Sequence, residues 1–324
     1  MPPRRRAVLL AAPGALLAGS ARGQGAWPNR PVRMVSSSPP AGASDILTRT
    51  LSAALQERTG QPFVVENRAS AGGVVGSDFV AKAVPDGYTW LTTNVGPQAI
   101  VRALQPSLPY DTRTDFRHVV TIGTLPLVLI VDAALPVRNL ADYLTLARER
   151  PGGVNYGTGG NGTLHHLTGE LLKVAARVDV VHVPYRGAQA ATADVIGGRI
   201  QSMWDSLPSA APHIRAGTVR AIAVSGRERS PSFPDVPTVA ESGYPEVVTT
   251  NWFGVAGPAR TPDDVAARMN EEVVRALGTP TVRERLAGIG VEPGGGTPAE
   301  TGAFVLAEIE RWGRIVRDTG VTLD

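Results

Sequence analysis

A glycine-rich segment, residues 156–170, has the residue types that hold an anion. A short apolar run precedes it, and residues 163–175 follow with leucines at helical spacing. Four glycines lie between, and their freedom at positive φ lets the backbone fold tightly and expose N–H groups. Thr163 can cap the helix through its hydroxyl. Because unpaired N–H groups and the positive end of a helix dipole favour negative charge, this segment predicts an anionic ligand.

A second segment of this kind, residues 37–45, follows a predicted first strand, residues 32–36. Leucines recur every four residues after it, and Ser44 is a natural N-cap for the helix that they predict. Ligands of open α/β sheets bind outside the carboxyl ends of the strands. We therefore expect the two loops to face each other across a cleft.

Composition excludes several classes of protein. The 324 residues are 43% hydrophobic, and the formal charge is +3. The first 25 residues hold four of the 32 basic residues and no acid, so the remainder has 28 basic and 29 acidic residues and is nearly neutral. Charge therefore gives no reason to expect nucleic-acid binding. The chain has no cysteine, and its five scattered histidines form no His-x-x-x-His pair, so we predict no metal site and no cofactor.

The first 25 residues have the order of a secretory signal peptide. Three arginines precede the apolar run 7–19, and small residues follow it. The run is too short to span a bilayer, and Pro13 and Gly14 interrupt it, so cleavage is favoured over an uncleaved anchor. The arginine run also loosely fits a twin-arginine signal, and Sec and Tat export stay open. We expect an exported, periplasmic protein.

Strands and helices alternate along the rest of the chain, which predicts an α/β fold with βαβ units and a mostly parallel sheet. The rhythm falters after Asp111, where the apolar stretch 119–131 is split by Gly123 and Pro126 and is a plausible crossing between two domains. The predicted division is a signal peptide at 1–25, domain 1 at 26–124 plus 250–324, and domain 2 at 125–249.

Short motifs along the whole mature chain resemble the tripartite tricarboxylate transporter receptors, also called the Bug family of periplasmic solute-binding proteins. No single motif is decisive, but this many in one order is specific. The matching stretches are residues 27–33, 65–68, 71–73, 85–89, 156–170, 183–187, 235–243 and 252–254. The resemblance implies a type II periplasmic-binding-protein fold with two lobes, capture of a small carboxylate, and delivery to a transporter of two integral membrane subunits. A monomer is expected.

The resemblance also implies which residues hold the ligand, through backbone groups and ordered water from both loops. The residues carried over from the first loop are Ser38, Ala41, Gly42, Ser44 and Asp45, and those from the second are Thr158, Gly159, Asn161, Gly162, Thr163 and His166. The first loop departs from the family pattern, because Ser37 and Ser38 replace Pro-Phe and Ala41 replaces a glycine. These changes predict a more polar pocket.

Several of these residues also have structural interpretations. An acid in the first helical turn is commonly a dipole or capping partner, which we favour for Asp45. Asp205 ends a predicted strand on the cleft side and is a candidate for a ligand amine, although Asp-Ser before Pro208 is equally a helix-start signal. Adjacent histidines project about 100° apart on a helix, so they cannot share one metal, and we expect His166 to orient the glycine loop. Arg68 is a weaker candidate for carboxylate contact.

Two other functions compete with that of a transport receptor. A ligand sensor that feeds a signalling protein would use the same binding physics. A dinucleotide-binding enzyme is suggested by Gly157-x-Gly159-x-x-Gly162, but Asp179 precedes the next strand rather than following it, so it stands at the wrong end to hold a ribose. No nucleophile elbow or triad spacing is present, and we predict that the protein is not an enzyme.

Overall fold

The computed structural model describes residues 27–38, 40, 42–105 and 107–323. The predicted signal peptide and Ala41 lie outside them. Helices and strands alternate through the described chain. The strands are β1 (Val32–Ser36), β2 (Phe63–Asn67), β3 (Thr89–Asn94), β4 (Phe116–Asp132), β5 (Val154–Thr158), β6 (Val180–Pro184), β7 (Ser202–Ser206), β8 (Val219–Val224), β9 (Thr250–Pro258) and β10 (Glu292–Gly295). The helices are α1 (Ala43–Thr59), α2 (Val74–Ala81), α3 (Val101–Leu104), α4 (Leu140–Glu149), α5 (Leu164–Ala176), α6 (Ala188–Ile196), α7 (Leu207–Arg215), α8 (Asp263–Leu277), α9 (Pro280–Gly288) and α10 (Pro298–Thr319).

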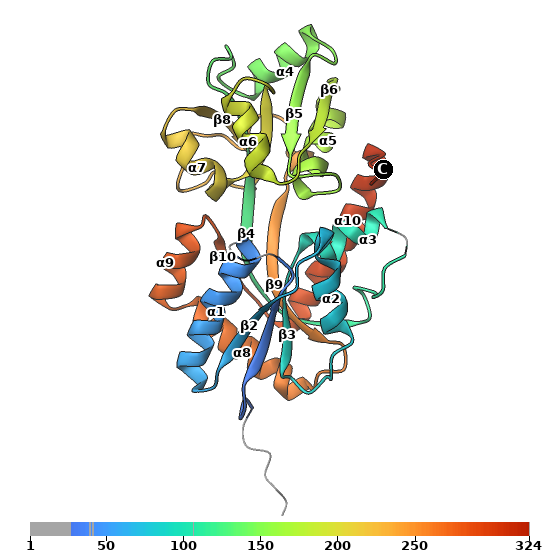
Figure 1. The fold of residues 1–324 in the computed structure, drawn as a ribbon, viewed down its shortest axis with the longest axis vertical. Coiled ribbons are helices and arrows are strands. Elements are labelled where there is room, and N and C mark those ends of the chain that lie inside the picture. Colours follow the sequence, from blue (N-terminus) through green and yellow to red (C-terminus); the bar gives the residue numbers. More distant parts are fainter. Residues whose placement is uncertain (1–26, 39, 41, 106, 324) are drawn as a thin grey trace, which may run out of the picture.

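The strands form two lobes that share one long strand (Figure 1). Lobe 1 has the order β2-β1-β3-β9-β4, with β10 also paired to β4. Lobe 2 has the order β4-β7-β5-β6, with β8 also paired to β4. Up to Pro126, β4 pairs with β9, and from Leu127 it pairs with β7. The α/β fold class and the two lobes are as expected from the sequence.

The prediction of a mostly parallel sheet is wrong. The βαβ units do give parallel pairs, namely β1 with β2 and β3, and β5 with β6 and β7. However, β4 and β9 run through the centre of the molecule antiparallel to each other and to their other partners. The apolar stretch read as split by Gly123 and Pro126 is one continuous 17-residue strand.

Hydrophobic packing continues between the lobes. One buried cluster belongs to lobe 1 and includes Trp90 and Phe253. Another cluster joins lobe 2 residues such as Leu167 to Trp312 of α10. Helix α10 runs from lobe 1 to the side of lobe 2, where it contacts α5 (Figure 1). Its N-terminus has a complete capping box, in which Thr297 and Glu300 each hydrogen-bond the other's backbone N–H.

No helix in the described part of the chain is long and apolar enough to cross a membrane.

Candidate functional site

A cavity of about 700 Å³ lies between the two lobes. The carboxyl ends of parallel strands open into it from both sides. Lobe 1 contributes Ser38 after β1 and Asn94 at the end of β3, and lobe 2 contributes Asn161 after β5 and Asp205 in β7. This is the position where open α/β sheets bind ligands, because the loops there connect strand ends to helix N-termini.

The predicted site residues divide into two groups. Those that line the cavity are Ser38, Gly42, Ser44, Asn161, Gly162, Thr163 and Asp205. Asp45, Thr158, Gly159 and His166 are not among the lining residues. The loops of the two lobes therefore do face each other, and the second group lies behind them.

The first loop differs from the expected capping. The N-cap of helix α1 lies two residues earlier than predicted, at Gly42 rather than Ser44. The Gly42 carbonyl accepts the Ile46 N–H at 3.0 Å. Ser44 is instead buried in the first turn, and its Oγ accepts a hydrogen bond from Asn94 Nδ2 at 3.0 Å.

Asp45 fixes the start of α1. Its carboxylate is 2% exposed and accepts hydrogen bonds from Asn67 Nδ2 at 2.7 Å and from Arg49 Nε at 3.0 Å. Asn67 also donates to the Ser38 carbonyl at 3.1 Å. Asp45 thus ties the end of β2 to the first loop. This role is structural, but it is not the capping role predicted from the sequence, because the N-cap of α1 is Gly42, which makes no side-chain cap hydrogen bond.

The second loop is held by its own polar side chains. Thr163 caps α5 by accepting the His166 N–H at 3.3 Å, and its hydroxyl donates to the Gly160 carbonyl at 2.8 Å. The Gly162 N–H donates to His166 Nδ1 at 3.1 Å, so His166 orients the loop as expected. Thr158 Oγ1 lies 2.7 Å from His182 Nε2.

Two histidine rings support this loop from below. His166 and His182 stack with ring centroids 3.8 Å apart. Burial lowers the pKa of His166, and burial together with the neighbouring His166 lowers the pKa of His182 to about 4. Both rings are therefore neutral near neutral pH, and a neutral His166 can accept the Gly162 N–H at Nδ1.

Three residues that line the cavity each have a buried polar side-chain atom with no hydrogen-bond partner within the described residues. These atoms are Ser37 Oγ, His165 Nδ1 and Asn251 Oδ1. Buried polar groups are nearly always hydrogen-bonded, so three such atoms around one cavity indicate a place for a polar ligand or water. Ser37 was predicted to make the pocket more polar, but sequence reasoning missed His165 and Asn251.

The cavity has no cationic side chain among its described lining residues, and Asp205 is its one charged group there. Positive potential comes instead from the backbone. The first turns of α1, α5, α6 and α7 all contribute lining residues, and they come from both lobes. Helix N-termini present unpaired N–H groups and the positive dipole end, which suit an anion.

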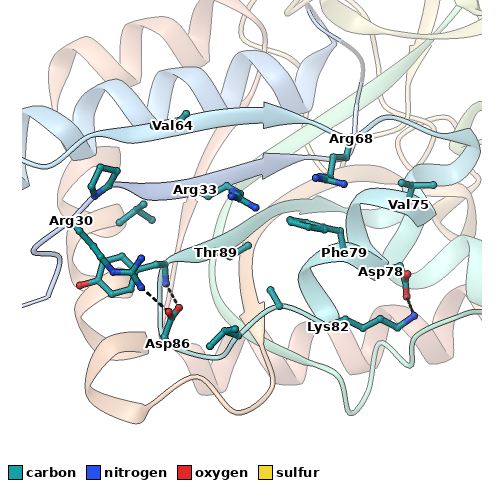
Figure 2. A pocket seen from close by; sticks show the side chains of 15 residues that line it. Arg30, Arg33, Val64, Arg68, Val75, Asp78, Phe79, Lys82, Asp86 and Thr89 are labelled. Carbon is teal, nitrogen blue, oxygen red and sulfur yellow. Dashed lines mark hydrogen bonds and ion pairs between the residues drawn. The ribbon is translucent and has the colours of Figure 1, made fainter.

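A different groove, of about 820 Å³, lies on lobe 1 over the sheet face beside α2 (Figure 2). Four cations line it, and each is paired within the protein. The pairs are Arg30–Asp86 at 2.8 Å, Arg33–Glu66 at 3.3 Å, Arg68–Glu66 at 2.6 Å and Lys82–Asp78 at 2.5 Å. Arg68 also lies over the Phe79 ring, 3.6 Å from its centroid. Arg68 is thus in this groove, outside the cavity between the lobes.

The first glycine of the dinucleotide-binding pattern, Gly157, has a packing role in this structure. Gly157 lies inside β5, and a Cβ there would approach Ile200 Cδ1 to 2.6 Å and Ala191 Cβ to 3.0 Å. The bare backbone therefore lets α6 approach the strand closely. Asp179 precedes β6, as predicted. The described residues also hold no cluster of histidine and carboxylate groups fit for a metal ion.

Comparison with known protein families gives one match that covers most of the chain. The family described as "Tripartite tricarboxylate transporter family receptor" matches residues 47–321. A protein of Pseudomonas sp. strain P51, "UPF0065 protein in tcbD-tcbE intergenic region", is 40% identical over 96% of this chain and 94% of its own length. "Protein BugT" of Bordetella pertussis is 38% identical over 92% of this chain and 91% of its own.

Solved structures agree with this match. "R. palustris Rpa4515 with adipate" has a TM-score of 0.82 and 36% identity, covering 91% of this chain and 99% of that one. "MatC (Rpa3494) from Rhodopseudomonas palustris with bound malate" has a TM-score of 0.77 and 31% identity, covering 89% and 99%. The two-lobed fold is therefore shared with one protein described with adipate and another described with bound malate.

Proposed function

The chain belongs to the tripartite tricarboxylate transporter receptor family, and on this premise we propose that it captures a small carboxylate in the cavity between its lobes. The observation that carries the proposal is the lining of that cavity. Helix N-termini from both lobes line it, and three buried polar atoms of its lining residues have no hydrogen-bond partner among the described residues. A carboxylate can accept several N–H and O–H bonds at once, so the helix N-termini and the Ser37 hydroxyl can hold it without a cationic side chain. Asn251 Oδ1 is an acceptor and takes its hydrogen bond from a ligand hydroxyl or amine, or from water.

The similar structures support this ligand class. Adipate and malate are named as bound in two of them, and both are small dicarboxylates. Di- and tricarboxylates, amino acids and aromatic acids all remain within the proposal. The ligand is held by the loops around Ser38 and Asn161, with Asp45, Thr158 and His166 positioning those loops from behind. Gly159 keeps the second loop free of side-chain bulk beside α6, where its Cβ would lie 3.4 Å from the Ala188 nitrogen.

Capture proceeds by closure of the lobes. Two segments cross between them, β4 around residues 123–125 and the entry into β9 at residues 249–251, and we assign the hinge to these crossings. The division into domain 1 (26–124 plus 250–324) and domain 2 (125–249) belongs to this proposal, and the change of partner along β4 supports it. A ligand that contacts both lobes stabilises the closed form, because its affinity for that form is greater.

The protein is exported to the periplasm, with residues 1–25 removed, and acts as a monomer that delivers its ligand to integral membrane transporter subunits. It is a binding protein and not an enzyme, in line with its family of receptors. A ligand sensor that contacts a signalling protein would use the same cavity. The dinucleotide-binding alternative is disfavoured by the packing role of Gly157 and by the position of Asp179.

Thermal unfolding of the mature protein with a panel of small molecules tests the proposal. The panel contains di- and tricarboxylates, amino acids and aromatic acids, with NAD, sugars and simple amines as controls. A ligand that binds only the native state raises the melting temperature as its concentration exceeds Kd. We expect a shift with one class of carboxylate. No shift with any carboxylate, together with a shift for NAD, would contradict the proposal.

A further inference from the structure

We propose that His165 senses the second negative charge of a dianionic ligand and takes up a proton as that ligand binds. This inference rests on the proposed function, since it needs a carboxylate in the cavity. His165 is then the group that distinguishes dicarboxylates from monocarboxylates, and the affinity for dicarboxylates depends on pH.

His165 has a free polar atom in the right place. It lies in the first turn of α5 and lines the cavity, and its Nδ1 is buried with no hydrogen-bond partner within the described chain. The adjacent His166 points elsewhere, to the Gly162 N–H and the His182 ring. Of the two histidines, His165 is therefore the one available to a ligand.

Asp205 is the charged group that acts on His165. It is fully buried in β7, where Oδ1 accepts the Ser206 N–H at 2.7 Å and Oδ2 lies 3.3 Å from Thr192 Oγ1. Thr192 has one hydroxyl proton and also lies 3.1 Å from the Ala188 carbonyl, so Asp205 shares it. No basic side chain lies within ion-pair distance of Asp205 in the described residues.

The other elements around His165 bring no further charge. Helix α6 contributes Ala188 and Gln189 to this side of the cavity, and neither titrates. Lobe 1 contributes hydroxyl, amide and apolar groups, without an acid or a base among its described lining residues. His165 and Asp205 are thus the titratable groups among the described residues that line the cavity.

A dianionic ligand changes the net charge around His165 and Asp205. A single carboxylate can be bound by the N–H groups at the helix N-termini. A second carboxylate brings another negative charge into a cavity that already holds Asp205, and a buried charge without a partner is costly. Proton uptake by His165 supplies the missing cation, because the imidazolium carries a positive charge and donates a hydrogen bond to the second carboxylate.

The direction of the pH dependence follows from the free protein. Burial lowers the pKa of His165, and the charge of Asp205 opposes this shift, so the ring is neutral near neutral pH. The ligand's negative charge raises that pKa again. At a pH between the lowered pKa of His165 in the free protein and its raised pKa in the complex, ligand binding is accompanied by uptake of a proton. The Kd for a dicarboxylate therefore falls with falling pH, by up to about tenfold per pH unit, and levels off below the free-protein pKa.

Calorimetric titration in buffers of different ionisation enthalpy measures this uptake. The probes are succinate, malate and adipate, and the tightest binder is compared with the monocarboxylate of the same chain length. We expect proton uptake with the dicarboxylate and none with the monocarboxylate. His165→Asn removes the uptake, and His213→Asn, at a histidine of α7 that does not line the cavity, retains it.

A second readout keeps the test independent of the variant's folding. The nitrogen chemical shifts of the His165 ring in the wild-type protein report its protonation directly, and we expect imidazolium in the dicarboxylate complex. A neutral ring there would overturn the inference, as would full uptake in His165→Asn. Dicarboxylate binding without any uptake contradicts this inference alone, whereas no carboxylate binding at all contradicts the proposed function.

Discussion

The surface groove on lobe 1 and the cavity between the lobes have linings that are opposite in character. The surface groove on lobe 1 is lined by Arg30, Arg33, Arg68 and Lys82, which are the usual side chains for binding an anion. The cavity between the lobes has no such side chain among its described lining residues and contains the buried acid Asp205. If the anion-binding site were chosen by the number of positive side chains, the groove would be chosen.

The hydrogen-bond and ion-pair partners of the lining residues instead favour the cavity between the lobes as the anion-binding site. Every cation of the groove is already paired with Glu66, Asp78 or Asp86, and Arg68 also covers Phe79. Figure 2 shows the pairs of Arg30 with Asp86 and of Lys82 with Asp78. The cavity instead offers helix N-termini from both lobes and buried side-chain atoms without partners among the described residues. An anion site is thus marked by helix N-termini and unsatisfied polar atoms, and the number of cations nearby is a poor guide.

The largest effect is expected from a negative charge placed in the cavity. Ser38 is partly buried and lines the cavity, so Ser38→Asp puts a carboxylate where the ligand carboxylate belongs. We expect the affinity, measured by calorimetric titration, to fall by about 100-fold or more, equal to ~2.7 kcal/mol. Thr279→Asp is the matched control, because it adds the same charge at the N-cap of α9, where aspartate is a good cap. Equal losses in both variants would show that the effect is one of overall charge.

A bulky residue at Gly159 should have the next largest effect. Gly159 does not have a positive φ, so a side chain is compatible with its backbone. Its Cβ would lie 3.4 Å from the Ala188 nitrogen and 3.7 Å from His165 Nδ1, and a valine would crowd both. We expect Gly159→Val to weaken binding by about tenfold or more, ~1.4 kcal/mol, with the melting temperature little changed. Gly302→Val, in open space on α10, is the control. Unchanged affinity in Gly159→Val would contradict the assignment of this loop.

Loss of the α5 cap should affect both stability and binding. Thr163→Ala removes the hydroxyl that accepts the His166 N–H and holds the Gly160 carbonyl. We expect unfolding in urea to show a loss of about 1 kcal/mol, and the affinity to fall several-fold. Thr279→Ala removes the equivalent cap of α9 and should reduce stability alone. A similar affinity loss in both variants would mean that binding responds only to global stability.

The smallest effect is expected in the surface groove. Arg68→Gln breaks the pair with Glu66 and the contact with Phe79. We expect a stability loss below about 1 kcal/mol, because partly exposed ion pairs contribute little, and an unchanged affinity. A loss of carboxylate affinity like that of Ser38→Asp would reverse the comparison between the groove and the cavity.

Local patterns in the sequence predicted most of the βαβ units. Strand β1 has the predicted bounds, and the loop between β5 and α5 was identified by its glycines and Thr163. Helix α9 was missed, although Thr279 followed by Pro280 is an N-cap and first-turn signal. These elements are encoded by neighbours in sequence, which is why reading along the chain finds them.

Features that depend on distant residues could not be predicted in this way. Gly123 looked like a break, but a Cβ there would lie 2.3 Å from the Glu292 carbonyl, so the glycine lets β10 pass β4. His166 was predicted as a ligand residue, whereas His165 lines the cavity. Spacing shows that two adjacent helical residues face differently, but only the packing of α5 decides which one faces the ligand.

A crystal structure with the tightest-binding carboxylate tests the central claim most directly. We predict the ligand between the lobes, with carboxylate oxygens about 2.7–3.2 Å from backbone nitrogens of both loops and no lysine or arginine in contact. A carboxylate bound instead in the lobe 1 groove, paired with Arg33 or Arg68, would contradict the account.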